Sequence, residues 1–127
     1  MKRGNEWRIQ RDLISYLKDR DWLVERLTGN AYQKGIPDLY IYRRDWGERW
    51  IDVKDPKRYS FTPAQREKWP IWSNAGVGIW ILTAATQAEY DKLFKPPNWK
   101  DYWKKSWDKL NVNAIIEELG RGEQESE

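Results

Sequence analysis

The sequence of 127 residues contains no histidine and no cysteine. Their absence excludes disulfides, thiolate zinc sites, cysteine nucleophiles, Ser-His-Asp triads and every general base that depends on histidine. An enzyme built from this chain has to work with carboxylates, lysine, tyrosine, serine, threonine or a hard cation. The length suffices for one domain with one core and hardly for two.

Long hydrophobic runs are missing as well. The longest apolar stretch, Val77 to Ala85, is far shorter than the ~20 residues that span a bilayer. The first residues, Met1 to Trp7, include no apolar segment of the kind found in a signal peptide. We therefore expect no membrane partner and a soluble cytoplasmic protein, located in the host cell interior if it is encoded by a virus.

Aromatic residues are abundant, with ten Trp, seven Tyr and two Phe. The net charge is +3, but residues 117–127 hold five Glu and one Arg, so that segment carries −4 and the rest of the chain +7. A basic, aromatic-rich body with a short acidic tail favours a polyanionic partner, although many soluble domains carry a similar charge.

The pattern of apolar and polar residues predicts a helix, three strands, a second helix and a fourth strand. Their ranges are 5–19, 22–27, 38–43, 49–54, 60–75 and 76–83. The short link between the second and third strands predicts a hairpin. The fourth strand is apolar throughout, which is typical of a strand buried on both faces and paired in parallel after a crossover. The expected fold class is therefore α/β, an αβββαβ core with a mixed sheet over about residues 5–95.

Capping residues predict where the helices begin and end. Asn5 is the expected N-cap of the first helix. Thr62 is the expected N-cap of the second, with Pro63 at its first position and Gln65 completing a capping box. Pro70 lies inside this second helix and is expected to kink it or end it early.

The remaining C-terminal residues predict a helical extension of the same domain, which would end near residue 119. Thr86 and Glu89 predict a capping box for a helix that Pro96 and Pro97 end. Within the extension over residues 98–119, Asn98 is expected to cap an aromatic helix, and a short final helix is expected over about 112–119. The aromatic stripe is expected to belong to the core or to a homodimer contact rather than to a base-stacking platform; its members are Trp99, Tyr102, Trp103 and Trp107. Residues 120–127 are expected to form a disordered acidic tail.

Three polar residues fall on the predicted hairpin in a pattern that indicates chemistry. Asp38 begins the second strand, while Asp52 and Lys54 share one face of the third because residues two apart in a strand point the same way. If the two strands pair as a hairpin, Asp38 and Asp52 can lie side by side. Two carboxylates ~4 Å apart repel by roughly 4 kcal/mol at an effective dielectric of 20. Such a site holds a proton or binds a cation, and oxygen ligands favour Mg²⁺ or Mn²⁺. Glu6, on the apolar stripe of the first helix, is a candidate third carboxylate.

The order of these residues resembles a known superfamily. Glu6, Pro37-Asp38, Asp52-Val53-Lys54 and Gln65 are similar to the motif of the PD-(D/E)XK nucleases, in particular of their VRR-NUC branch, which is related to the archaeal-type Holliday junction resolvases. The resemblance covers about residues 5–95. Asp52 stands where the VRR-NUC branch usually has Glu, a change that the wider superfamily tolerates.

The resemblance implies a metal-dependent DNA endonuclease that hydrolyses phosphodiester bonds. It implies that Asp38, Asp52, the Val53 carbonyl and Glu6 hold Mg²⁺, for which Mn²⁺ substitutes. Lys54 would orient or deprotonate the attacking water, or offset charge in the transition state. Gln65 would position Lys54 or a phosphate oxygen. The implied substrates are branched DNA, junctions or flaps, in replication, recombination or repair, and a phage or mobile element is a natural source for so compact a nuclease.

Further residues are candidates for DNA contact. Lys57, Arg58 and Arg66 flank the expected site, and the loop with Tyr32 and Lys34 is placed to reach the DNA backbone.

Alternatives remain open at this point. Asp52 and Lys54 are also consistent with the solvated face of an edge strand. Gln65 is explained almost fully by its capping box, and Glu6 by the positive end of a helix. Two other functions compete: a non-catalytic nucleic-acid-binding module, and a restriction-type endonuclease acting on duplex DNA, against which the short chain argues.

Overall fold

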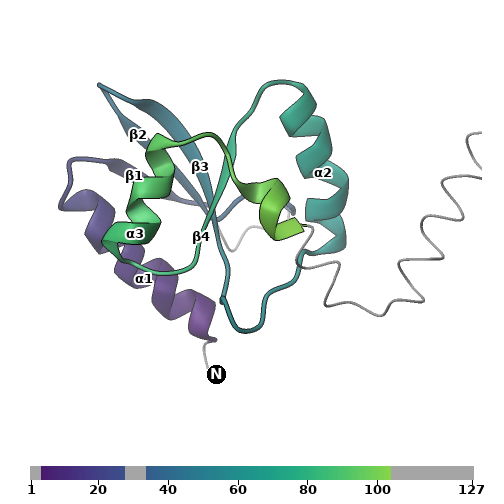
Figure 1. Ribbon diagram of the computed structural model, residues 1–127, viewed down its shortest axis with the longest axis horizontal. Coiled ribbons are helices and arrows are strands. Elements are labelled where there is room, and N and C mark those ends of the chain that lie inside the picture. The colour runs from purple at the N-terminus through teal and green to yellow at the C-terminus, as the bar shows by residue number, and fades with distance from the viewer. Residues whose placement is uncertain (1–3, 28–33, 104–127) are drawn as a thin grey trace, which may run out of the picture.

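The computed structural model describes residues 4–27 and 34–103. Its elements follow the predicted αβββαβ order (Figure 1). They are α1 (Asn5–Lys18), β1 (Leu23–Arg26), β2 (Leu39–Arg43), β3 (Gly47–Val53), α2 (Pro63–Asn74), β4 (Ile79–Leu82), α3 (Gln87–Tyr90) and the 3-10 helix η2 (Asp91–Phe94). Residues 99–103 form a further helical turn. Trp107, the helix predicted at 112–119 and the acidic tail lie outside the described residues.

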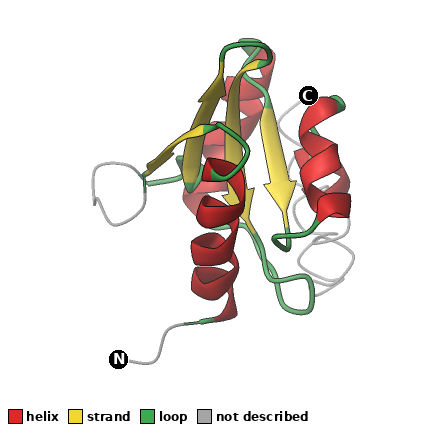
Figure 2. Cartoon of the chain, turned by 90° about the vertical axis from the view of Figure 1, so that its left-hand side faces the viewer, coloured by secondary structure: helices red, strands yellow, loops and turns green. Residues whose placement is uncertain are grey.

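The four strands form one mixed sheet in the order β1-β2-β3-β4. The first three are antiparallel neighbours, and β4 lies parallel to β3 after the α2 crossover, as predicted. Leu39 pairs with Ile51 in the β2–β3 hairpin, so the preceding residue, Asp38, lies opposite Asp52. The helices α1 and α2 lie on opposite faces of this sheet (Figure 2).

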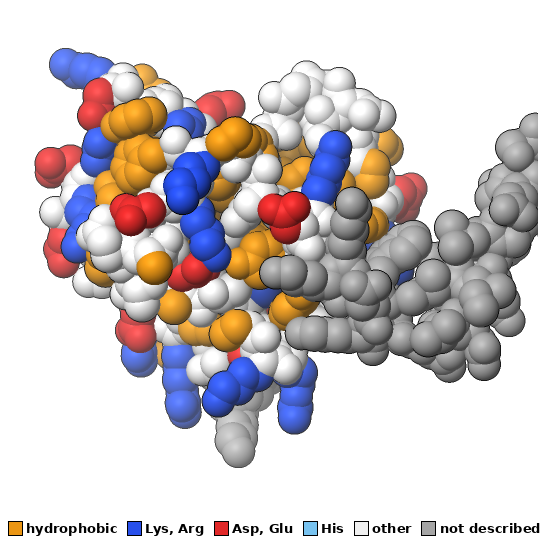
Figure 3. Space-filling view, viewed as in Figure 1, with side chains coloured by type: hydrophobic (Ala, Val, Ile, Leu, Met, Phe, Trp, Pro, Cys, Tyr) orange, Lys and Arg blue, Asp and Glu red, His pale blue; other side chains and the backbone are white. Residues whose placement is uncertain are grey.

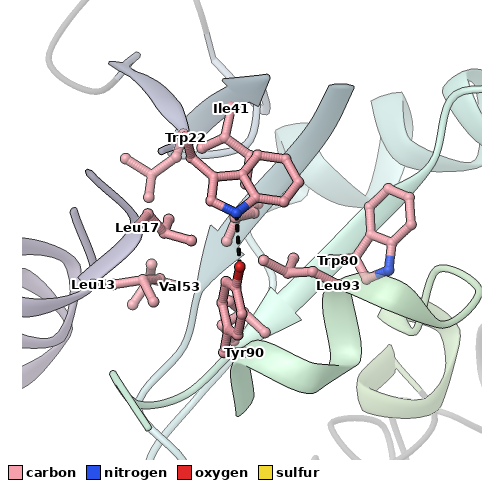
Figure 4. Close-up of a cluster of buried hydrophobic side chains, with 11 residues drawn as sticks. Leu13, Leu17, Trp22, Ile41, Val53, Trp80, Tyr90 and Leu93 are labelled. Atoms are coloured by element: carbon pink, nitrogen blue, oxygen red, sulfur yellow. Dashed lines mark hydrogen bonds between the residues drawn. The ribbon is translucent and has the colours of Figure 1, made fainter. Parts of the chain in front are cut away.

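The face of the sheet toward α1 carries the larger apolar core. Alternate residues of β2 and β3 point into it, as a period of two requires, and they meet the buried face of α1. Figure 4 shows this cluster, in which the indole N–H of Trp22 donates to the hydroxyl oxygen of Tyr90 over 3.0 Å. The cluster contains Leu13, Leu17, Trp22, Leu39, Ile41, Ile51, Val53, Trp80, Leu82, Tyr90 and Leu93.

The opposite face carries a second, aromatic core beneath α2. It contains Phe61, Trp69, Ile79, Ile81 and Trp99. The described part of the predicted aromatic stripe therefore belongs to the core, with Trp99 only 5% exposed. All four residues of β4 are buried, because the two cores enclose this strand from both sides.

Asn98 has a different role from the one predicted. Its side chain, expected to cap the following helix, instead accepts from the Ile81 N–H over 2.6 Å and donates to the Ile81 carbonyl over 3.1 Å. A carboxamide that makes both bonds replaces a neighbouring strand at the outer edge of β4. At Ile81 the edge is therefore closed to pairing with another chain.

The start of α2 confirms the predicted capping box, with bonds of 3.1 Å in each direction between Thr62 and Gln65. Of the two predicted effects of Pro70, the early end of this helix is wrong, because α2 continues to Asn74, and the kink stays a prediction. Pro70 removes one backbone donor, but packing on both sides of it compensates. Trp69 is fully buried, and the Trp72 ring lies edge-to-face against Trp50 with centroids 5.1 Å apart.

Two other helix starts differ from prediction. Asn5 is the first residue of α1 rather than its cap, and the cap position is Gly4. Thr86 caps α3 by accepting from the Glu89 N–H, but the Glu89 carboxylate does not complete a capping box. It accepts instead from the backbone and hydroxyl of Thr83, both over 2.8 Å, because the end of β4 presents donors that need an acceptor.

Candidate active site

The two predicted acids meet where β2 begins and β3 ends. Asp38 precedes β2, and its carbonyl accepts from the Leu27 N–H over 2.8 Å, which anchors this residue to the sheet. Its carboxylate accepts from the Val53 N–H over 2.8 Å. Asp52 points to the same side and is only 1% exposed. The hairpin therefore brings the two carboxylates together, as expected if the two strands pair.

The pair is electrostatically unfavourable when both members are ionised. Burial, and then the charge of Asp52, raise the pKa of Asp38 to about 8, against the lowering effects of the Val53 N–H and of Lys54. Burial also raises the pKa of Asp52, although Lys54 and Asp38 both act to lower it. A positive charge added beside these carboxylates would therefore be stabilising.

Lys54 supplies part of that charge. Its Nζ lies 2.9 Å from Oδ2 of Asp52 and donates to Oε1 of Gln65 over 3.1 Å. The backbone N–H of Lys54 donates to the Leu82 carbonyl over 3.2 Å, which continues the β3–β4 pairing past the end of the strand. The side chain is 5% exposed. The alternative that Asp52 and Lys54 form a solvated edge face is therefore wrong.

Gln65 belongs both to the helix cap and to the site. Its Oε1 is shared between the Thr62 N–H and the Lys54 ammonium, and its Nε2 donates to Oδ1 of Asp52 over 3.3 Å. The capping box fixes the side chain, and the fixed side chain contacts both members of the ion pair. The helix-capping role and the active-site role, which the sequence left as alternatives for Gln65, are thus both filled by this side chain.

The carboxylate of Asp52 has capacity for a further ligand. Its Oδ2 is completely buried and has no hydrogen-bond partner of suitable geometry within residues 4–27 and 34–103, although the Lys54 charge lies nearby. Since the acidic groups here offer only oxygen donors, the residues fit a hard divalent cation such as Mg²⁺ or Mn²⁺.

Glu6 lies near the site without joining the two aspartates. Burial raises its pKa, Lys54 opposes that rise, and Asp52 and Asp55 add to it. In the described part of the chain, no group of three or more acidic side chains is close enough to hold an ion. Glu6 instead lines a groove of about 490 Å³ at the start of α1, together with Gly4, Asn5, Asp55, Lys57 and Arg58.

The predicted DNA-binding residues within residues 4–27 and 34–103 do not all line one groove. Lys57 and Arg58 are exposed and line the groove that Glu6 lines. Lys34 lines a different groove, on the outer side of α2. The Arg66 guanidinium lies 5.8 Å from the centre of the Trp103 ring, and Tyr32 lies outside the described residues. Figure 3 shows Lys and Arg side chains along the lower edge of the molecule, where in Figure 1 the start of α1 and the β3–α2 loop lie.

Sequence reasoning missed two residues beside the site. The rings of Phe61 and Trp69 lie 4.8 and 5.8 Å from Nζ of Lys54, measured to their centroids. Both are buried in the α2-side core. Aromatic residues are so frequent in this chain that no local pattern distinguishes these two from ordinary core residues.

None of the helices within the described residues has the length and apolar character needed to cross a membrane. The chain matches no protein-family model and no curated protein. It is similar to a solved structure described as a VRR_NUC domain, with a TM-score of 0.57 and 21% sequence identity over 73% of this chain and 97% of that one. The resemblance inferred from the motif order is thus confirmed at the level of fold, and the chain has the fold of a VRR_NUC domain.

Proposed function

We propose that the chain is a metal-dependent endonuclease that hydrolyses phosphodiester bonds in DNA. The observation that carries the proposal is the buried amine of Lys54, held between Asp52 and Gln65 and adjacent to Asp38. A buried ion pair is an inefficient way to stabilise a fold. Two carboxylates can, however, hold a divalent cation, and an amine can orient a water or offset charge on a phosphate, so the three groups suit metal-assisted hydrolysis of a phosphodiester. The VRR_NUC fold supports the same reaction class.

Asp38, Asp52 and the Val53 carbonyl are the proposed ligands of Mg²⁺ or Mn²⁺. Glu6, which the sequence predicted as a further ligand, is not among them, because it does not join the two aspartates in the described part of the chain. The bound ion would polarise the scissile phosphate and lower the pKa of a bound water. Oδ2 of Asp52, which is buried and accepts no hydrogen bond within the described residues, and the raised pKa of Asp38 support this assignment.

The chain's own residues supply the remaining chemistry. Lys54 is the one cationic side chain among the motif residues. Its Nζ would hold the attacking water or offset the negative charge that develops on the phosphate. Gln65 prevents Lys54 from turning away, because its Oε1 accepts from Nζ while the capping box fixes its own position. The buried side chains around Lys54 and Asp52 keep the local dielectric low, which strengthens electrostatic interactions with the phosphate.

The proposed substrates are branched DNA, junctions or flaps, in replication, recombination or repair. The groove with Lys57 and Arg58 opens beside Glu6 and is suited to contact phosphates next to the cleavage site. A homodimer would supply two active sites for a four-way junction. Because Trp99 is buried in the core, such a contact would have to use other residues; sedimentation at micromolar concentration tests it.

The deciding experiment compares labelled duplex, single-stranded, flap and four-way-junction DNA, each incubated with Mg²⁺ or with EDTA. Cleavage that requires Mg²⁺ and is absent in Lys54→Met supports the proposal, and the preferred DNA identifies the substrate. Binding of DNA without metal-dependent cleavage would overturn it in favour of a non-catalytic nucleic-acid-binding module. Preference for one duplex sequence would indicate a restriction-type enzyme.

A further inference from the structure

Trp69 connects α2 to the loop that leads into Asp38. Its side chain is fully buried, and its indole N–H donates to the Gly35 carbonyl over 2.6 Å, between residues 34 positions apart. Gly35 begins the segment Gly35-Ile36-Pro37-Asp38. The position of that segment relative to α2 thus depends on a bond from Trp69.

Gly35 is pressed against the same helix at a second point. Its φ is +82°, and a Cβ at this position would lie 2.7 Å from the Ala64 carbonyl oxygen. Only a glycine allows the loop to approach this closely with that backbone conformation. Gly35 therefore packs against Ala64 in the first turn of α2, and its carbonyl accepts from Trp69 in the second turn.

The ring of Trp69 also borders Lys54. Nζ of Lys54 lies 5.8 Å from its centroid and 4.8 Å from that of Phe61, and the two rings pack edge-to-face 5.4 Å apart. The polar partners of Nζ, on Asp52 and Gln65, are thus complemented by an aromatic wall. Cation–π attraction and exclusion of water both restrict where the ammonium can lie.

We propose that Trp69 is a positioning residue that sets the placement of the Asp38 carboxylate relative to the Lys54 amine. One side chain fixes both groups: its N–H holds the loop before Asp38, and its ring holds Lys54. The inference rests on the proposed nuclease function, in which these two groups act on the same phosphate. A displacement of about 1 Å at a reacting group can cost about 100-fold in rate.

The test replaces Trp69 with Phe, which keeps an aromatic ring in the core and removes the N–H. The matched control is Trp99→Phe, because Trp99 belongs to the same cluster, packs edge-to-face on Trp69 at 5.9 Å and is also buried. Each variant is compared at a temperature equally far below its own Tm. Trp69→Phe is expected to lower kcat by roughly 10- to 100-fold with KM for DNA unchanged, while Trp99→Phe stays within about threefold of wild type.

A second measurement is independent of activity. Amide hydrogen exchange at Ile36 and Asp38, and the NMR signals of the Lys54 side chain, report on the two groups directly. Both are expected to change in Trp69→Phe and to stay as in wild type in Trp99→Phe. Equal behaviour of the two variants in exchange and NMR would overturn the positioning role, as would equal kcat values. A wild type that cleaves nothing would overturn the nuclease function instead, and the exchange and NMR comparison would still decide the role of Trp69.

Discussion

Nζ of Lys54 lies 2.9 Å from Oδ2 of Asp52, and both side chains are almost completely buried. Asp52 and Lys54 are two positions apart at the end of β3, so the strand directs them to one side, beneath the first turn of α2. A pair of this kind adds little net stability compared with apolar residues of the same volume, but breaking it is costly. This asymmetry makes Lys54 the most informative residue to replace.

Lys54→Met is expected to lower the free energy of unfolding by about 3 kcal/mol in EDTA, because it leaves Asp52 buried without an opposing charge. Saturating Mg²⁺ should recover part of that loss, since a cation at Asp52 would restore the positive charge. The variant should still bind DNA and metal while losing cleavage. Urea unfolding with EDTA or Mg²⁺ measures the first effect.

The exposed Lys57 provides the control for this variant. Lys57→Met should leave the unfolding curve within about 0.5 kcal/mol of wild type. A Lys54→Met protein as stable as Lys57→Met in EDTA would contradict the ion pair.

Asp52→Asn tests the metal site. Wild type should melt at a higher temperature in Mg²⁺, with about 2.7 kcal/mol of stabilisation when the ion is present at 100 times its Kd. Asp52→Asn should lose that increase because it lacks one of the two proposed carboxylate ligands. Asp55→Asn, which changes an acid of the neighbouring groove, should keep it. Equal Mg²⁺-dependent shifts in wild type and Asp52→Asn would exclude Asp52 as a ligand.

The closeness of Asp38 and Asp52 was predictable because both belong to one hairpin. The exact register was not, since β3 begins at Gly47 rather than at the predicted residue 49. The capping box of α2 was predictable for a similar reason, since Thr62 and Gln65 are three residues apart. Contacts within a few residues, or across a tight turn, leave a pattern in the sequence.

Contacts between distant elements leave no such pattern. The continuation of α2 past Pro70 depends on Trp72 meeting Trp50 of β3, and the Asp38 loop depends on Trp69 meeting Gly35. Propensity indicated a helix break at Pro70, and tertiary packing overrode it. The sequence likewise placed Glu6 near the site but could not show that it would line the adjacent groove.

The double role of Gln65 can be separated by a pair of variants. Thr62→Ala removes the hydroxyl that accepts from the Gln65 N–H and should cost about 1 kcal/mol of stability. It leaves the Gln65 side chain in contact with Lys54 and Asp52, so kcat should fall by less than about threefold. Gln65→Leu should lower kcat at least about tenfold, because Lys54 and Asp52 both lose a partner. Equal kcat values in the two variants would reduce Gln65 to a helix cap.

Glu89, which lies away from the site, is expected to make the stability of the fold depend on pH in acid. The Glu89 carboxylate accepts from the N–H and hydroxyl of Thr83 and pairs with Lys92. Burial acts to raise the pKa of Glu89, but the bonds from Lys92 and Thr83 outweigh it and lower that pKa below 4.5. The folded state therefore keeps Glu89 ionised at a lower pH than the unfolded state does. The resulting stability is fully present above pH 4.5 and is lost as the pH falls through the folded-state pKa.

Glu89→Gln keeps an acceptor for Thr83 and removes the charge. At neutral pH it should be less stable than wild type by about 1 kcal/mol, since hydrogen bonds to ionised groups are roughly twice as strong as neutral ones. The difference should shrink as the pH falls below 4.5, because wild type then loses the same charge by protonation. Urea unfolding at a series of pH values measures it, with Glu67→Gln on the exposed side of α2 as the control. A difference that stayed constant into strong acid would show that the charge of Glu89 contributes nothing to folding.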